Sequence, residues 1–142
     1  MSINLIGSAI ITLLQPLVTQ GKVKQLDQFS SNDISGYPRI QVLSKGAITE
    51  YLTNRERLIT YNYDVVVTQE KTKENIGAGN AELIMDTLIQ EIIQLFDEQI
   101  NSGVPLSGTV DFIRPVETEE LDSVQELAVI QHIIKVQAVK TV

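Results

Sequence analysis

An amphipathic segment begins the chain. Apolar residues recur there at helical spacing, with Asn4, Ser8 and Thr12 on the opposite side. The apolar positions are Ile3, Ile6, Ile10, Leu13 and Leu17. This pattern predicts a helix over residues 3–15 that frays or kinks at Pro16, because proline cannot donate a helical hydrogen bond.

The next part of the chain alternates in short runs, which indicates strands. Residues 22–29 are consistent with a short edge strand, and residues 37–43 with a second strand. Residues 44–55 are mixed in polarity and are expected to form a connection or a long hairpin arm. Residues 57–68 have the clearest strand pattern in the chain. There Ile59, Tyr61, Tyr63, Val65 and Val67 alternate with Thr60, Asn62, Asp64 and Val66, as expected for one buried and one hydrated sheet face.

A long amphipathic helix is predicted over residues 80–99. Its apolar stripe is expected to bury Ile84, Leu88, Ile92 and Leu95 against a sheet. Met85, Ile89, Ile93 and Phe96 widen that stripe, and acidic and amide residues occupy the other side.

The C-terminal part predicts two more strands separated by an acidic segment. Residues 108–115 are expected to form the first strand, and residues 117–125 an acidic turn or loop. Residues 127–139 form the closing strand, with apolar residues on both faces. That pattern is typical of a central strand or a covered edge.

The element order is therefore a helix, strands, a long helix and two strands. This order favours an α+β fold in which a mostly antiparallel sheet of about four to five strands carries the long helix and the N-terminal helix. Residues 1–142 are expected to form a single domain, since the length suits one domain and no linker interrupts the pattern.

Composition narrows the function. The chain has no cysteine, which removes disulfides, thiolate nucleophiles and cysteine-based metal sites. Its net charge is −7, so it lacks the surplus of Lys and Arg that binding to DNA phosphates requires. The apolar run at residues 5–14 has no preceding cation and is interrupted by Gln15 and Pro16, so neither a signal peptide nor a membrane span is expected.

Catalytic chemistry has few candidate residues. The single histidine, His132, lies in the middle of a predicted strand, where a structural role is the commoner one. Glu117, Glu119, Glu120 and Asp122 are dense enough to attract Ca²⁺ but lack the loop pattern of a calcium site. No glycine pattern is complete for a phosphate loop. We therefore expect no enzyme, no cofactor and no metal, and a protein that works by binding and assembly.

Several strand motifs resemble those of one protein family. GYPRIQV occupies residues 36–42, and R-x-x-x-Y-x-Y-x-V-x-V residues 57–67. The helix sequence IIQLFDEQI lies at residues 92–100, and V-x-F-I-R-P-V at residues 110–116, before a last alternating strand. In this order the chain resembles the tail terminator proteins (tail completion or minor tail proteins) of long-tailed bacteriophages, over almost its whole length.

The resemblance implies a ring, most simply of six identical subunits, in the virion. Such a ring caps the head-proximal end of the tail tube, ends its polymerisation and joins it to the head connector. It would contact itself, the tail-tube protein and the head–tail connector proteins, while DNA passes through its lumen without specific binding. The alternatives are another head–tail neck adaptor, a tail-tube subunit, or a small-ligand-binding or enzymatic domain.

Charged residues are candidates for the joint between subunits. Arg55 and Arg57 flank Glu56 at the entrance to the clearest strand, where a solvated entrance or an interface ion pair would suit them. We expect them to meet the acidic residues Glu117, Glu119, Glu120 and Asp122 of a neighbouring subunit. The strands at residues 37–43 and 127–139 are expected to leave exposed sheet edges for that joint.

Overall fold

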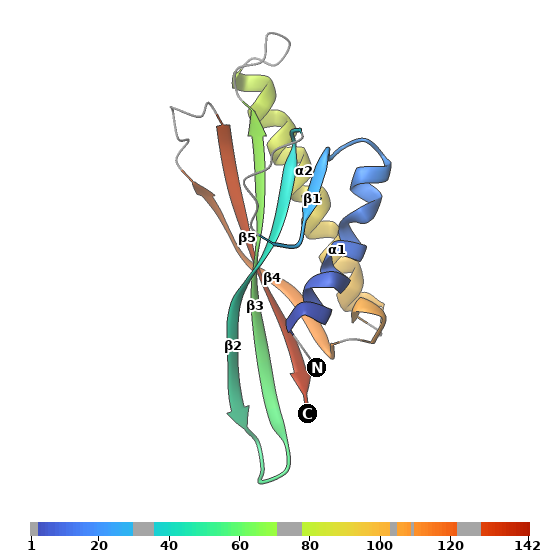
Figure 1. Ribbon diagram of the computed structural model, residues 1–142, viewed down its shortest axis with the longest axis vertical. Helices are drawn as coiled ribbons and strands as arrows, with labels where there is room; N and C mark the ends of the chain where they lie inside the picture. Colours follow the sequence, from blue (N-terminus) through green and yellow to red (C-terminus); the bar gives the residue numbers. More distant parts are fainter. Residues whose placement is uncertain (1–2, 30–35, 71–77, 103–104, 109, 122–128) are drawn as a thin grey trace.

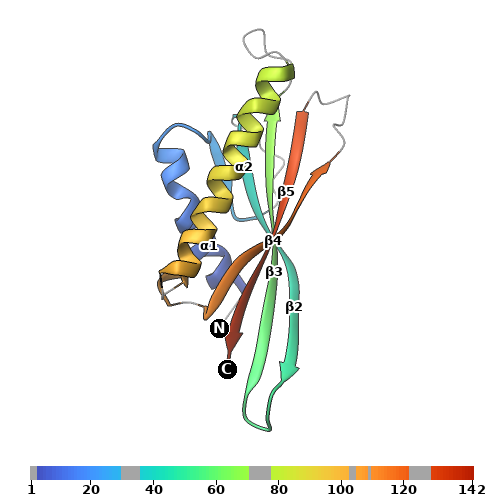
Figure 2. The same ribbon diagram turned by 180° about the vertical axis from the view of Figure 1, so that it is seen from behind.

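The computed structural model describes residues 3–29, 36–70, 78–102, 105–108, 110–121 and 129–142. This part of the chain folds into two layers, a long twisted sheet and a pair of helices packed on one of its faces (Figure 1, Figure 2). The predicted α+β class and the mostly antiparallel sheet are both confirmed. Among the described residues, no helix lies over the other face of the sheet, and we call this the open face.

Within the described residues the sheet has five strands, in the order β1-β2-β3-β5-β4. The strands are β1 (Gln25–Asp27), β2 (Arg39–Tyr51), β3 (Arg57–Glu70), β4 (Phe112–Leu121) and β5 (Val129–Thr141). Only β1 and β2 pair in parallel; the other neighbours are antiparallel. β1 is short and β5 lies inside the sheet, and both features agree with the sequence pattern. The expectation that residues 127–139 leave an exposed edge was wrong, because β4 covers β5.

Both helices press apolar residues onto the covered face. α1 (Ile3–Thr19) packs over β1 and β2, and α2 (Ala78–Asn101) crosses β3, β5 and β4. The fully buried centre combines Ile6, Ile10 and Leu14 of α1 with Met85, Ile92 and Phe96 of α2 and with Ile40, Val65 and Ile134 of the sheet. Burial of aliphatic side chains is the main stabilising contribution in a core with so few aromatics.

The helix α1 runs four residues past its predicted end, straight through Pro16. Pro16 and Thr12 are both exposed, so water can hydrate the carbonyl group that the proline leaves without a helical donor. Leu17, only 3% exposed, packs the last turn onto the core. Just past the end of the helix at Thr19, Gly21 has a φ of 77° and closes a Schellman motif, in which the N–H groups of Gly21 and Lys22 donate to the carbonyl oxygens of Val18 and Leu17.

The buried stripe of α2 is rotated from the predicted one. Leu88 and Ile92 are buried as expected, but Ile84 is 37% exposed and Leu95 only half-buried. Met85 takes the core position at the start of the stripe. A helix buries the residues that point straight at the sheet, and the direction of α2 across the strands could not be predicted from its own periodicity.

Strand β4 begins and ends later than predicted. Pro105–Gly108 forms a 3₁₀ turn, and pairing with β5 starts only at Phe112. The predicted acidic loop is instead strand as far as Leu121. Glu117 and Glu119 tolerate this because both lie on the open face, each 3.6 Å from the Nζ atom of Lys135 on β5.

Candidate assembly surfaces

The outer half of β2 forms a long open edge. β1 pairs only with Arg39 to Gln41 of β2, so from Leu43 onward no other described strand covers this side. Beyond the register shift between Ser44 and Ala47, β2 continues along β3 as a hairpin arm. The arm projects past the helices (Figure 1, Figure 2). The hairpin alternative for residues 44–55 is therefore correct, with strand up to Tyr51.

The arm is held together by backbone pairing, and its β2 strand is exposed along the whole arm. Thr53 Oγ1 accepts hydrogen bonds from the N–H groups of Arg55 and Glu56, at 3.1 and 3.0 Å, which closes the turn. Two backbone bonds of 2.8 Å join Arg57 to Val142 at the end of β5. The arm nevertheless exposes Ile48, Tyr51 and Leu52 by 60%, 75% and 54%. Apolar side chains held in the open in this way suit contact with another protein surface.

The second open edge is β4, at the other side of the same sheet. It contains Pro115, which belongs on an edge because it has no N–H to donate to a further strand. A second register shift lies between Pro115 and Glu117. Val116, the additional residue there, is 44% exposed.

The predicted charged residues lie on both of these surfaces. Arg55 and Arg57 are exposed at the tip and base of the arm's turn. Glu117, Glu119 and Glu120 belong to β4, and Asp122 lies outside the described residues. The two sets are thus at opposite sides of the sheet within one subunit, and no ion pair joins them in the part of the chain that the structure describes.

A row of charges crosses the open face. Asp64 on β3 pairs in register with Lys135 on β5, which pairs with Glu117 on β4. The carboxylates of Glu117 and Glu119 raise the pKa of the Lys135 ammonium group, Glu117 having the larger effect. Lys45 of β2 lines the same shallow hollow as these residues. The row therefore ends in a cation at the β2 edge and in carboxylates at the β4 edge.

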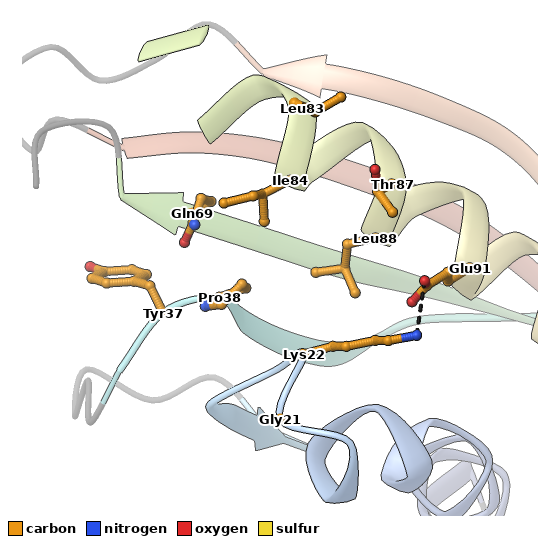
Figure 3. A pocket seen from close by; sticks show the side chains of 10 residues that line it. All are labelled: Gly21, Lys22, Tyr37, Pro38, Gln69, Leu83, Ile84, Thr87, Leu88 and Glu91. Carbon is orange, nitrogen blue, oxygen red and sulfur yellow. Dashed lines mark hydrogen bonds and ion pairs between the residues drawn. The ribbon is translucent and has the colours of Figure 1, made fainter. Parts of the chain in front are cut away.

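A mainly apolar groove of about 490 Å³ runs between α2 and the start of β2. Figure 3 shows Ile84 and Leu88 pointing from α2 toward the chain at Tyr37 and Pro38. On one side the groove is bounded by an ion pair of 2.9 Å between Lys22 and Glu91. Among the described lining residues, the two charged ones, Lys22 and Glu91, pair with each other.

His132 and Tyr63 are two further titratable side chains. His132 is half-buried on the covered face, opposite Val67 of β3. Burial raises the pKa of the Tyr63 phenol to about 12, while a hydrogen bond with the Gly7 backbone acts in the opposite direction. Within the described ranges no group of three or more His, Asp or Glu residues could hold a metal ion. Neither α1 nor α2, as far as they are described, is long and apolar enough to cross a membrane.

Comparison with known proteins identifies no relative: no protein-family model matches the chain, and no curated protein matches it. Sequence reasoning missed the edge residues Ile48 and Val116 and the groove beside α2. Pro115 was an available signal for the β4 edge, since a proline within a strand favours an edge position.

Proposed function

We propose that the protein is a structural subunit of a phage tail: a tail terminator that forms a closed ring, caps the tail tube and joins it to the head connector. The phage context comes from the resemblance of its strand and helix motifs to that family. The ring is supported by one structural observation, the pair of different open edges on opposite sides of a single sheet.

Two different edges favour a heterologous contact. The outer half of β2 and the whole of β4 differ in sequence, charge and shape, so an edge of one copy suits the other edge of the next copy. A head-to-tail contact of this kind produces a closed ring when its rotation closes, and a helical filament when it does not. Ring closure would cover both edges in every subunit, which removes the liability of exposed edges.

The charge distribution suits a channel for DNA. The chain has a net charge of −7, and α2 contains no Lys, Arg or His over its whole length. Acidic surfaces repel phosphate groups, so a duplex could pass without being held. The ring would therefore make its specific contacts with itself, the tail-tube protein and the connector.

Negative-stain imaging of the purified protein, alone and mixed with tail tubes, tests this proposal. The expected result is closed rings of uniform size, six subunits by the resemblance, that also attach to tube ends. Filaments of unlimited length would contradict it and assign the chain to the tail tube itself. A monomer that neither forms rings nor attaches to tubes would also contradict it.

A further inference from the structure

We propose that the open edges join the subunits directly, with β4 of one copy lying antiparallel to the outer half of β2 in the next copy, in a single register. This inference rests on the proposed ring, and it specifies how neighbouring subunits of that ring are joined. The expected direction follows from the sheet itself. β2, β3, β5 and β4 are successively antiparallel, so β4 runs opposite to β2, and a copy added alongside presents an antiparallel edge.

The available length of β2 requires a stagger. Because β1 already covers β2 as far as Gln41, an incoming β4 can pair only from Leu43 outward. Within the sheet of one subunit, however, the pairings through β5 and β3 place Glu117 at the same height along the strands as Leu43. They place Phe112 at the same height as Ile48. The neighbour must therefore be displaced toward the tip of the arm. Closed barrels of strands have a stagger of this kind.

Charge complementarity selects one staggered register. On the outer half of β2, Lys45 and Glu50 are five positions apart; on β4, Arg114 and Glu119 are also five apart. Each interval contains one register shift, between Ser44 and Ala47 on β2 and between Pro115 and Glu117 on β4. An antiparallel pairing that places Arg114 opposite Glu50 therefore also places Glu119 opposite Lys45.

The same register keeps the two faces of the sheet continuous. Glu50 and Ile48 lie on the open face, since they pair with Leu58 and Thr60 of β3. Arg114 and Glu119 lie on that face as well, through Gln137 and Ile133 of β5. Because both strands have a bulge in this interval, the alternation of faces is preserved along the whole contact.

An apolar contact then falls between the two charge pairs. In this register Val116 and Glu117 together lie opposite Ile48. Val116 is 44% exposed and Ile48 60% exposed in the single subunit, and both become covered in the joint. Their contact, flanked by ion pairs, has the apolar centre and polar rim typical of protein interfaces.

Unwanted pairings are disfavoured by the same residues. Two β4 edges brought together would bring two glutamate-rich strands side by side, and Pro115 removes one backbone donor from each. Within the described residues no ion pair holds Lys45, so its ammonium group is available to a neighbour. The outer half of β2 instead offers Lys45 and Glu50, one charge of each sign, at the spacing of Glu119 and Arg114 on β4.

Disulfide trapping tests the register, since the chain has no cysteine of its own. Under mild oxidation, the variant Ile48→Cys/Val116→Cys should produce a ladder of crosslinked subunits that stops at the ring size. The matched variant Ile48→Cys/Phe112→Cys represents the unstaggered register and should remain uncrosslinked. Both members of each pair lie on opposite edges of one subunit, so the crosslink can form only between copies.

The outcomes separate this inference from the proposed function. Crosslinking of the Phe112 variant instead of the Val116 variant would overturn the register, and rings imaged without crosslinking of either variant would overturn the edge joint while leaving the ring intact. If no rings form at all, the proposed function itself fails.

Charge exchange gives a second, independent readout. Glu50→Arg and Arg114→Glu should each raise the concentration for half-assembly by about tenfold, as expected for a like-charge pair at an interface. Combined in one chain, the two substitutions should restore assembly, because opposite charges again face each other with their positions exchanged. Glu98→Arg on the exposed side of α2 makes the same charge change as Glu50→Arg and should leave assembly unchanged. Equal effects of Glu50→Arg and Glu98→Arg, or a double variant no better than the single ones, would overturn the pairing.

Discussion

The two halves of β2 have opposite surroundings within one continuous strand. From Arg39 to Leu43 its residues are buried or half-buried, with Ile40 and Val42 on the covered face, whereas from Ser44 to Tyr51 every residue is exposed. The inner half belongs to the core of the subunit; the outer half has regular backbone pairing and apolar side chains but no core beneath it. Such an extension adds little to the stability of the single subunit, and its exposed apolar residues suit the subunit contact proposed above.

The largest contrast is expected between two isoleucines of this strand. Ile40 is fully buried and Ile48 is 60% exposed. Ile40→Ala should lower the free energy of unfolding by about 2–5 kcal/mol, through lost burial and a cavity. Ile48→Ala should change it by less than about 0.5 kcal/mol and act on assembly instead. Urea unfolding of the unassembled protein measures both, and similar losses at the two positions would break the distinction between the halves.

The junction of the halves provides the next test. Gly46 has a φ of 96°, and a Cβ atom added there would meet no other atom within 4 Å. Gly46→Ala should therefore cost about 1–3 kcal/mol through backbone strain alone, without a clash. Thermal unfolding and amide exchange in the arm would register this change. An unaltered melting temperature together with an unaltered arm would show that the bulge geometry is not required.

Two tyrosines extend the comparison to pH. Burial raises the pKa of Tyr63 to about 12, from an ordinary value of 10.0, whereas Tyr51 on the arm is 75% exposed. Below pH 10 the phenol is protonated in both the folded and unfolded chains, so its contribution is fully present. Above pH 10 the unfolded chain ionises first, and this contribution is lost as the pH rises through about 12.

Tyr63→Phe should therefore reduce the alkaline loss of stability, with only a small effect at neutral pH, while Tyr51→Phe should leave the profile unchanged. Unfolding followed from pH 8 to 12 gives the comparison. Identical profiles for both variants and the parent would contradict the assignment of the raised pKa to the buried Tyr63.

The smallest effect is expected at the Lys22–Glu91 ion pair beside the groove. Both side chains are partly exposed, at 46% and 30%, and exposed pairs contribute about 0–1 kcal/mol. Lys22→Ala should cost no more than that, and the cost should shrink in high salt. A larger, salt-independent loss would mean that the aliphatic part of Lys22 stabilises the groove by packing.

The sequence predicted the elements well and their surroundings less well. The period of two in residues 57–68 and the period of 3.6 in α2 located both elements, since burial on one face imposes those periods directly. Ile84 was misplaced because the crossing direction of α2 depends on strands far away in the chain. β4 was misplaced for a similar reason. The sequence around Glu117 and Glu119 is typical of an acidic loop, and only the strand pairing shows that Lys135 lies opposite them.

The assembly surfaces were harder to predict than the fold. Arg55 and Arg57 were selected for their charge, and they do lie on the exposed arm. The structure shows that two edge residues, Ile48 and Val116, are exposed. In the sequence they are ordinary apolar residues, and only their exposure distinguishes them. Exposure of an edge depends on strand order, which local patterns do not encode.

Amide hydrogen exchange on the assembled particle, compared with the dilute subunit, tests the central claim most directly. We predict slower exchange after assembly in residues 43–51 and 112–119, the two edges, because their backbone N–H groups become paired or covered. Exchange in the buried turns of α2 around Ile92 should stay unchanged. Assembled particles whose two edges exchange as fast as those of the dilute subunit would contradict it.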